Sequence, residues 1–181
     1  MDKKELRRQI REAKKLVPLE EKLRRSAPIM NQVEQLPQFQ QASTVLLYWS
    51  MDDEVQTHSF VERWYRQKVL LLPCVVGDDL VLRRYTGPEC MRAGEQFGIG
   101  EPTGPVFDAY DSIDLIIVPG VAFDHQMNRM GRGRGFYDRL LKTTPHAFKV
   151  GVAFDFQMVK EVPVEPFDVP MDAVVAEGDM K

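Results

Sequence analysis

The sequence has few of the residues that build a disulfide framework or a metal site. Among its 181 residues there are two cysteines, Cys74 and Cys90, which are too few for a disulfide scaffold. The three histidines, His58, His125 and His146, do not have the spacing of metal ligands. We therefore expect two reduced thiols, as in a cytosolic protein, and a fold that is stabilised by its apolar core.

Long apolar runs and an excess of positive charge are also missing. No apolar stretch approaches the length of a membrane span, and the charged N-terminus, MDKKELRRQIREAKKL, lacks the apolar centre of a signal peptide. The formal net charge is −3, so no overall basic field attracts nucleic acid or an anionic membrane. We expect a cytoplasmic monomer without a nucleic-acid or membrane partner, in which any anion site is local.

The sequence does contain apolar strands that alternate with amphipathic helices. Helices are expected at residues 3–17, 19–36 (with Pro28 as a kink or break), 59–67 and 136–143. Buried strands are expected at residues 43–50, 68–76, 114–120, 149–155 and 171–177, with a partly exposed strand at 78–85 and a long loop at 86–111. The predicted fold is α/β: a single three-layer domain over residues 1–181, with a mainly parallel central sheet flanked by helices and a helical N-terminal arm.

A stretch rich in glycine and arginine, MGRGRGFYDRLL, lies between a predicted strand and a predicted helix. Ligands of open α/β sheets bind at the carboxyl ends of the strands, where a helix N-terminus offers unpaired N–H groups. Gly131, Gly133 and Gly135 let the backbone approach an anion closely, while Arg132 and Arg134 supply forked donors that suit phosphate. The pattern predicts a phosphate site. A flexible surface turn and an RGG-like nucleic-acid segment are the alternatives.

Three neighbouring residues belong to the same pattern. Arg129 supplies a third positive charge just upstream, and Tyr137 and Asp138 close the stretch. Asp138 falls in the first turn of the predicted helix, where a carboxylate interacts well with the helix dipole. Beside a phosphate, a carboxylate is also the expected ligand of Mg²⁺.

Over the longer stretch VPGVAFDHQMNRMGRGRGFYDRLL, the chain resembles the 5-formyltetrahydrofolate cyclo-ligase (5,10-methenyltetrahydrofolate synthetase) family. The family pattern runs Pro-Gly-x-x-Phe-Asp and then Arg-Leu-Gly-Arg-Gly-Lys-Gly-Tyr-Tyr-Asp. The stretches YWSMDDEVQT and VPVEPFDVPMDAVV also resemble the family. Arg134 stands where the family usually has Lys, and Phe136 stands where it usually has the first Tyr. The second change removes a hydroxyl, so we assign no acid–base role to Phe136.

The resemblance implies an ATP-dependent cyclisation of 5-formyltetrahydrofolate to 5,10-methenyltetrahydrofolate. ADP and phosphate are released, and the reaction passes through a phosphorylated formyl intermediate. The implied co-substrate is ATP, and the implied metal is Mg²⁺. A non-catalytic nucleotide- or RNA-binding relative is the main alternative, and a kinase for another small molecule is a third possibility.

The resemblance also implies roles for individual residues. It assigns ATP contacts to Lys3, Arg7, Arg129, Met130, Gly131, Arg132, Gly133, Arg134, Gly135, Phe136 and Tyr137. It assigns folate contacts to Trp49, Met51, Glu54, Arg132, Gly133, Arg134, Gly135 and Phe136. The catalytic residues it implies are Arg132, Arg134 and Tyr137, and the metal ligands are Asp138 and Asp168.

Simpler interpretations remain open for several of these residues. Lys3 and Arg7 share one edge of a helix, as ATP contacts or as part of a solvated basic face. Trp49 is either a platform for a flat pterin or a core residue, and Asp168 either binds metal or makes local backbone hydrogen bonds. Glu54, as a carboxylate, can accept two pterin N–H donors in parallel. Among neighbouring residues we expect Arg8, Arg11 and Lys14 to be solvated, Asp52 and Asp53 to lie in a turn, and Asp124 to shape its loop.

Overall fold

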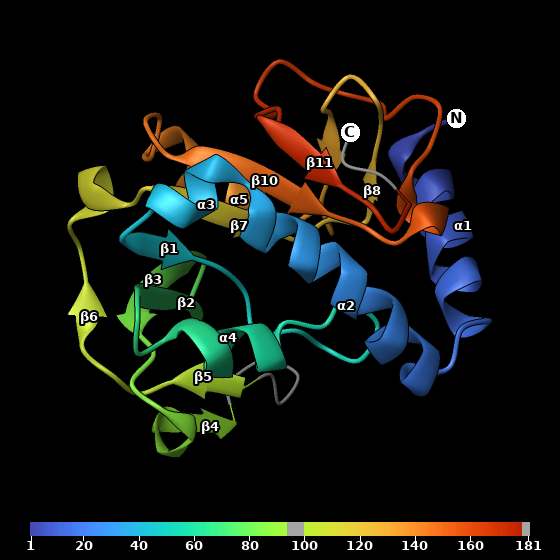
Figure 1. The fold of residues 1–181 in the computed structure, drawn as a ribbon. Coiled ribbons are helices and arrows are strands. Elements are labelled where there is room, and N and C mark those ends of the chain that lie inside the picture. Colours follow the sequence, from blue (N-terminus) through green and yellow to red (C-terminus); the bar gives the residue numbers. More distant parts are fainter. Residues whose placement is uncertain (94–99, 179–181) are drawn as a thin grey trace.

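A seven-stranded sheet forms the centre of the computed structural model, which describes residues 1–93 and 100–178 (Figure 1). The strand order is β11-β10-β7-β1-β2-β3-β6. Their bounds are Thr44–Leu46 (β1), Val69–Val76 (β2), Asp79–Arg84 (β3), Val106–Phe107 (β6), Leu115–Val118 (β7), Phe148–Val152 (β10) and Ala173–Val175 (β11). Neighbours from β11 to β2 are parallel, and β3 and β6 are antiparallel. The predicted mainly parallel sheet is confirmed.

Helices cover both faces of this sheet because its central strands are apolar on both sides. On one face lie α2 (Leu19–Gln35), α3 (Pro37–Gln41) and α4 (His58–Trp64), and on the other lies α5 (Phe136–Lys142) (Figure 1). Leu70 and Leu72 pack with the first group, whereas Leu71 packs with α5. Alternate residues of one strand therefore enter two cores, and the three-layer prediction is confirmed.

Helix α1 (Lys3–Lys15) forms the predicted N-terminal arm. The Asp2 side chain caps it by accepting a hydrogen bond of 2.8 Å from the Glu5 N–H. Its apolar residues Leu6 and Ile10 pack on a small separate cluster that includes Met130. Met130 belongs to a short antiparallel pair formed by β8 (Ala122–Phe123) and β9 (Arg129–Met130). The arm is thereby placed next to the start of the glycine–arginine stretch.

The break that was one possibility at Pro28 is absent, and one predicted strand is shorter than expected. Helix α2 continues through Pro28 without a break, because the buried residues Ile29, Met30 and Val33 pack its next turn against the sheet. Strand β1 ends at Leu46 rather than at residue 50, and the chain then leaves the sheet.

The predicted long loop at 86–111 is also wrong, since it holds short pieces of regular structure. These are the 3₁₀ turns Pro88–Cys90 and Tyr110–Ser112, strand β6, and the antiparallel strands β4 (Met91–Ala93) and β5 (Gly100–Pro102); residues 94–99 lie outside the described part. Another 3₁₀ turn follows β10 at Asp155–Gln157. Such short strands form only through their partners, so their own composition does not reveal them.

Two expectations from the composition concern the cysteines and membrane-spanning helices. Cys74 and Cys90 form no disulfide, as predicted, and both are buried. Within residues 1–93 and 100–178, no helix has both the length and the apolar composition needed to cross a membrane.

Candidate active site

A pocket of about 690 Å³ opens at the carboxyl edge of the parallel strands. Tyr48 and Trp49, which follow β1, and Pro119 and Gly120, which follow β7, contribute to its wall. From β1 the chain continues to β2 on one side, while β7 pairs with β1 on the other. The pocket therefore lies where the direction of strand order reverses, which is the usual ligand site of an open α/β sheet.

Every residue for which the sequence analysis predicted a site role lines this one pocket. They are Lys3, Arg7, Trp49, Met51, Glu54, Arg129, Met130, Gly131, Arg132, Gly133, Arg134, Gly135, Phe136, Tyr137, Asp138 and Asp168. They come from α1, from the segment after β1, from the stretch that runs from β9 into the first turn of α5, and from the segment before β11. The structure brings them together, while their individual roles remain predictions.

Further lining residues were missed. They are Tyr48, Pro73, Val75, Leu80, Gly100, Glu101, Pro119, Gly120, Glu165 and Phe167. Some stand beside a predicted residue in the sequence, as Tyr48 does beside Trp49 and Phe167 beside Asp168. Their position next to a predicted site residue could have identified them. Val75, Leu80 and Glu101 reach the pocket through the antiparallel strands β2 and β3 and through β5, and no local pattern indicates that placement.

The segment 131–135, which we call the glycine–arginine loop, has a backbone that favours glycine at two places. Gly133 has a φ of 104°, and Gly135, the residue before α5, has a φ of 72°. Side chains hold both ends of the loop: Arg7 Nε donates to the Gly131 carbonyl at 3.0 Å, and Arg139 Nη1 donates to the Arg134 carbonyl at 3.0 Å. Side chains of α1 and α5 are therefore hydrogen-bonded to the two ends of the loop.

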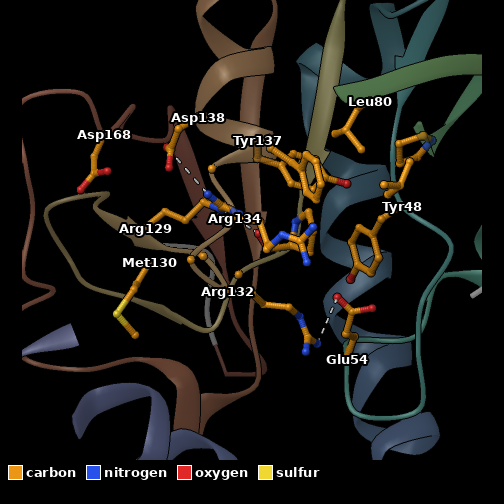
Figure 2. Close-up of a pocket in the computed structure, with 18 of the residues that line it drawn as sticks. Tyr48, Glu54, Leu80, Arg129, Met130, Arg132, Arg134, Tyr137, Asp138 and Asp168 are labelled. Carbon is orange, nitrogen blue, oxygen red and sulfur yellow. Dashed lines mark hydrogen bonds and ion pairs between the residues drawn. The ribbon is translucent and has the colours of Figure 1, made fainter. Parts of the chain in front are cut away.

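Arg129 connects the end of β7 to the start of α5. It is 8% exposed, and its Nε donates to the Pro119 carbonyl at 2.7 Å. Its Nη1 lies 3.8 Å from Asp138 Oδ1, and its guanidinium carbon lies 5.3 Å from the centre of the Tyr137 ring (Figure 2). Burial lowers the pKa of Arg129, and the Asp138 carboxylate opposes that shift. An arginine remains charged under such conditions, so it places a fixed positive charge at the pocket wall.

Glu54 stands at one end of the pocket, on the segment that follows β1 (Figure 2). Its side chain is 14% exposed, and its Oε1 accepts a hydrogen bond of 2.8 Å from the Met51 N–H. Burial raises the pKa of Glu54, although that hydrogen bond and the Arg132 charge oppose the shift. Arg132 Nη2 lies 3.9 Å from Glu54 Oε2. A partly desolvated carboxylate of this kind accepts hydrogen bonds strongly from a ligand that enters the pocket.

Two tyrosines face the space beside Glu54 (Figure 2). Burial raises the pKa of Tyr48 and of Tyr137 well above the usual range, and the Glu54 charge raises both further. The Tyr48 hydroxyl donates to the Val55 carbonyl at 2.7 Å. Both phenols are therefore expected to stay protonated near neutral pH, and a protonated phenol can donate a hydrogen bond.

One interpretation of the residues beside this site was wrong, and a second residue makes contacts that its sequence context did not indicate. Lys14, predicted to be solvated, is 7% exposed, and its Nζ lies 3.4 Å from Asp53 Oδ2. Asp53 lies in a turn, as predicted, and it also receives Arg132 Nη2 at 3.2 Å and 3.3 Å. Burial alone would raise the pKa of Asp53, but Lys14 and Arg132 hold it below its usual value. Lys14 is buried and reaches Asp53 because α1 lies against the segment after β1. This is a tertiary contact that the local sequence does not indicate.

Asp124 shapes its loop as predicted. It is 0% exposed, and its carboxylate accepts hydrogen bonds of 2.9 to 3.1 Å from Gln126, Asn128 and Val162.

Trp49 is placed in a way that agrees with both of its interpretations. Its ring stacks on the His58 ring, with the two centres 3.8 Å apart and an interplanar angle of 14°. It also lines the pocket beside Gly100, where an added Cβ would come within 2.9 Å of the indole. The glycine therefore allows strand β5 to lie close to the indole, while the ring still contributes to the pocket.

Two carboxylates, Asp138 and Asp168, lie together at the other end of the pocket (Figure 2). Lys3 Nζ lies 3.4 Å from Asp168 Oδ2, and Asp138 Oδ1 accepts a hydrogen bond of 3.4 Å from the Val169 N–H. In the described part of the chain, no group of three His, Cys, Asp or Glu side chains could hold a metal ion by itself. Mg²⁺ commonly takes one or two carboxylates together with phosphate oxygens, and this donor set fits that pattern.

The fold and the pocket define an α/β protein of the class that binds its ligands at the carboxyl edge of a parallel sheet. Residues 1–177 match the model of the 5-formyltetrahydrofolate cyclo-ligase family. The chain therefore belongs to the 5-formyltetrahydrofolate cyclo-ligase family, which confirms the resemblance noted in the sequence.

Individual relatives agree with this assignment over most of their length. The chain is 35% identical over 150 residues to the 5-formyltetrahydrofolate cyclo-ligase of Haemophilus influenzae, covering 78% of each chain. It is 28% identical to the mouse enzyme of the same name, covering 97% of this chain and 93% of the relative. Among solved structures, Aquifex aeolicus 5,10-methenyltetrahydrofolate synthetase superposes with a TM-score of 0.89 at 36% identity, covering 100% of this chain and 92% of that one. The predicted fold class is thereby confirmed a second time.

Proposed function

We propose that this protein converts 5-formyltetrahydrofolate to 5,10-methenyltetrahydrofolate at the expense of ATP. Family membership over residues 1–177 supports the proposal. The observation that carries it is the arrangement of one pocket: Glu54 lies at one end, Asp138 and Asp168 lie at the other, and the glycine–arginine loop lies between them (Figure 2). The reaction transfers a phosphoryl group from ATP to the folate. It therefore needs a folate site and a site for metal-bound nucleotide at opposite ends, with cationic groups between them at the transferred phosphate.

The chemistry explains why a phosphate must be transferred. The formyl oxygen on N5 attacks the γ-phosphorus of ATP, and the bond to the ADP oxygen breaks. N10 then attacks the activated formyl carbon and loses its proton, and the carbon–oxygen bond breaks to release inorganic phosphate. The products are ADP, phosphate and the methenyl-bridged folate. Most of the catalysis in phosphoryl transfer comes from positioning and from stabilisation of charge.

The cationic residues of the pocket are the proposed phosphate ligands. Arg132 and Arg134 flank Gly133, whose positive φ lets the backbone close on an anion. Lys3 and Arg7 face the same pocket from α1, and Arg7 also holds the loop through Gly131. We assign to Arg132 and Arg134 the stabilisation of charge on the transferred phosphoryl group.

The folate is proposed to occupy the end that holds Glu54. A pterin presents a row of N–H donors, and the partly buried Glu54 carboxylate is the acceptor placed for them. The Trp49 ring and Met51 provide apolar surface beside it. To the Tyr137 hydroxyl, which lines the same pocket, we assign a hydrogen bond to the oxyanion charge that develops in the reaction.

We assign Mg²⁺ to Asp138 and Asp168, with ATP phosphate oxygens completing its coordination. Bound there, the ion would neutralise phosphate charge and orient the γ-phosphoryl group. Lys3, which pairs with Asp168 at 3.4 Å, would then be available to the phosphates. We further propose that the enzyme acts as a cytoplasmic monomer on small-molecule substrates, in keeping with its two buried, free cysteines.

One assay tests the activity directly. Purified protein is mixed with 5-formyltetrahydrofolate and Mg-ATP, and both the absorbance of methenyltetrahydrofolate and the formation of ADP are followed. We expect the two products to form in equal amounts. Folded protein that binds ATP without forming either product would instead indicate a non-catalytic nucleotide-binding relative, and ADP formation without the methenyl product would indicate a kinase for another small molecule.

A further inference from the structure

A row of alternating charges joins the glycine–arginine loop to two other segments. Asp53 Oδ2 lies 3.4 Å from Lys14 Nζ, and both Asp53 oxygens accept from Arg132 Nη2, at 3.2 Å and 3.3 Å. The same Nη2 lies 3.9 Å from Glu54 Oε2 (Figure 2). The row therefore runs from α1 through the segment after β1 to Arg132, and it ends at the carboxylate assigned to the folate.

Burial is uneven along this row. The Lys14 side chain is 8% exposed, whereas those of Asp53 and Arg132 are 41% and 50% exposed. An ammonium group removed from water requires a counter-ion, and Asp53 is the carboxylate within reach of Lys14. An exposed Asp–Arg pair is weak by itself. Here Asp53 contacts a second cation, the buried Lys14, so its carboxylate is held from two sides.

The geometry of Arg132 leaves it able to bind a ligand while it is held. In its contacts with the described carboxylates, Arg132 uses Nη2 alone. A guanidinium group has five N–H donors, so those on Nε and Nη1 remain for an incoming anion. Asp53 is also nearer to Arg132 than Glu54 is. Its charge keeps Arg132 from pairing closely with Glu54, where Arg132 would compete with a pterin.

We propose that Asp53 is a positioning residue for the ring closure, and that Lys14 positions Asp53 in turn. Asp53 orients Arg132 toward the phosphoryl group and preserves Glu54 as an acceptor for the folate. This inference rests on the proposed function, because it assigns Arg132 and Glu54 the ligands given above.

A purely structural role is the competing explanation, in which the Lys14–Asp53 pair only fastens α1 to the rest of the protein. Helix α1 already has an apolar anchor, since Leu6 and Ile10 pack on Val121, Ala122 and Met130. The two explanations predict different measurements. A fastening pair affects the melting temperature, whereas a positioning pair affects substrate affinity and turnover at temperatures where every variant is folded.

The test compares Asp53→Asn and Lys14→Met with Lys15→Met. Lys15 is the matched control, because it pairs on the exposed face of the same helix with Glu12 at 3.7 Å. Turnover and KM are measured by the absorbance assay, and dissociation constants of folate and of a non-hydrolysable ATP analogue are measured by calorimetry. Thermal melting of each variant sets the temperature of the comparison.

We expect Asp53→Asn to raise the folate KM about tenfold or more and to lower turnover by a similar factor, because Arg132 moves toward Glu54. The ATP-analogue affinity should change less than the folate affinity. Lys14→Met should change both parameters in the same direction, Lys14→Arg should restore most of the loss, and Lys15→Met should have no effect. The double variant should lose little more than Asp53→Asn alone, since both act through one contact.

Three results would overturn the inference. One is Asp53→Asn kinetics equal to wild type, and another is a loss confined to the melting temperature. The third is a double variant whose losses multiply as those of independent sites do. Wild-type turnover is measured first, because it separates the proposed function from the positioning role of Asp53. If the wild type shows no turnover, the proposed function is wrong. If the wild type turns over normally and Asp53→Asn has unchanged kinetics, only the positioning role is wrong.

Discussion

At the scale of single residues, Glu54 is placed where function and stability make opposite demands. It is a carboxylate with a 14% exposed side chain and a pKa raised by burial. A raised folded-state pKa means that the stability linked to protonation is present below the unfolded-state pKa and is lost as pH rises through the folded-state pKa. Above its raised pKa the ionised Glu54 therefore destabilises the fold, while the same charge serves as the proposed acceptor for the pterin.

Glu54→Gln is expected to weaken folate binding far more than ATP binding. One charge-assisted acceptor is lost, typically ~1.5–3 kcal/mol, or roughly 10- to 150-fold in affinity. The melting temperature at pH 7 should be equal to or above that of wild type, because the amide oxygen can still accept from the Met51 N–H. Calorimetry with each ligand and thermal melting measure these effects, with Asp52→Asn as a control. Equal losses for both ligands would show that Glu54 does not bind the pterin.

Asp138 presents a similar choice between a structural and a catalytic role. Its carboxylate lies 3.8 Å from Arg129 Nη1. It also falls in the first turn of α5, where a negative charge interacts favourably with the helix dipole. Asp138→Asn is expected to reduce turnover chiefly by impairing Mg²⁺ use, so that raising the Mg²⁺ concentration recovers part of the activity. Turnover is measured across a series of Mg²⁺ concentrations. An unchanged Mg²⁺ dependence would return Asp138 to the structural role.

At the scale of elements, the glycine–arginine loop allows its shape to be tested separately from its charge. Gly133 has a φ of 104°, while an added Cβ would lie 3.5 Å from the Arg7 guanidinium, an ordinary contact distance. Gly133→Ala therefore strains the backbone, by about 1–3 kcal/mol, without a clash, and it alters the surface offered to phosphate. We expect turnover to fall strongly, while the melting temperature falls only by the roughly 2–12 °C that this strain implies and the protein stays folded at assay temperature. Early melting with full turnover at low temperature would make the loop a structural turn.

Arg132→Ala should act on charge alone. The backbone of the loop keeps its contacts through the carbonyls of Gly131 and Arg134, so its shape should persist. A charge-assisted contact to phosphate is lost, and we expect the KM for ATP to rise and turnover to fall with little change in melting temperature. Steady-state kinetics at saturating folate measure the change. Kinetics like those of wild type would remove Arg132 from the catalytic residues.

The elements that the sequence predicted are those whose signal is local. Strands such as β7 are continuous apolar runs, and α1 carries Leu6 and Ile10 at helical spacing, so each could be recognised within its own segment. Strands β4 and β5 exist only through pairs such as Arg92 with Glu101, which no local pattern encodes. The site follows the same rule. Its motif residues were identifiable from the resemblance, whereas the contact of Lys14 with Asp53 depends on two segments that meet only after folding.

At the scale of the whole molecule, the pocket is bounded by segments from both ends of the chain. Lys3 of α1 reaches Asp168, which precedes β11, and Arg7 reaches the glycine–arginine loop. The sheet between them is buried on both faces and provides a rigid base. A ligand that fills this pocket therefore contacts the N-terminal arm, the sheet edge and the C-terminal segment together, and its binding energy adds to the stability of all three.

Ligands should accordingly raise the melting temperature of the whole protein. A ligand present at 100 times its dissociation constant stabilises by about 2.7 kcal/mol, which for a chain of this size corresponds to roughly 5–10 °C. We expect such a shift with folate alone and with a non-hydrolysable ATP analogue alone, and a larger shift with both, since they occupy different ends of one pocket. Glu54→Gln should keep the nucleotide shift and lose most of the folate shift. A shift with the nucleotide but none with folate in the wild type would favour a nucleotide-binding protein without ligase activity, because the end of the pocket at Glu54 would then bind no pterin.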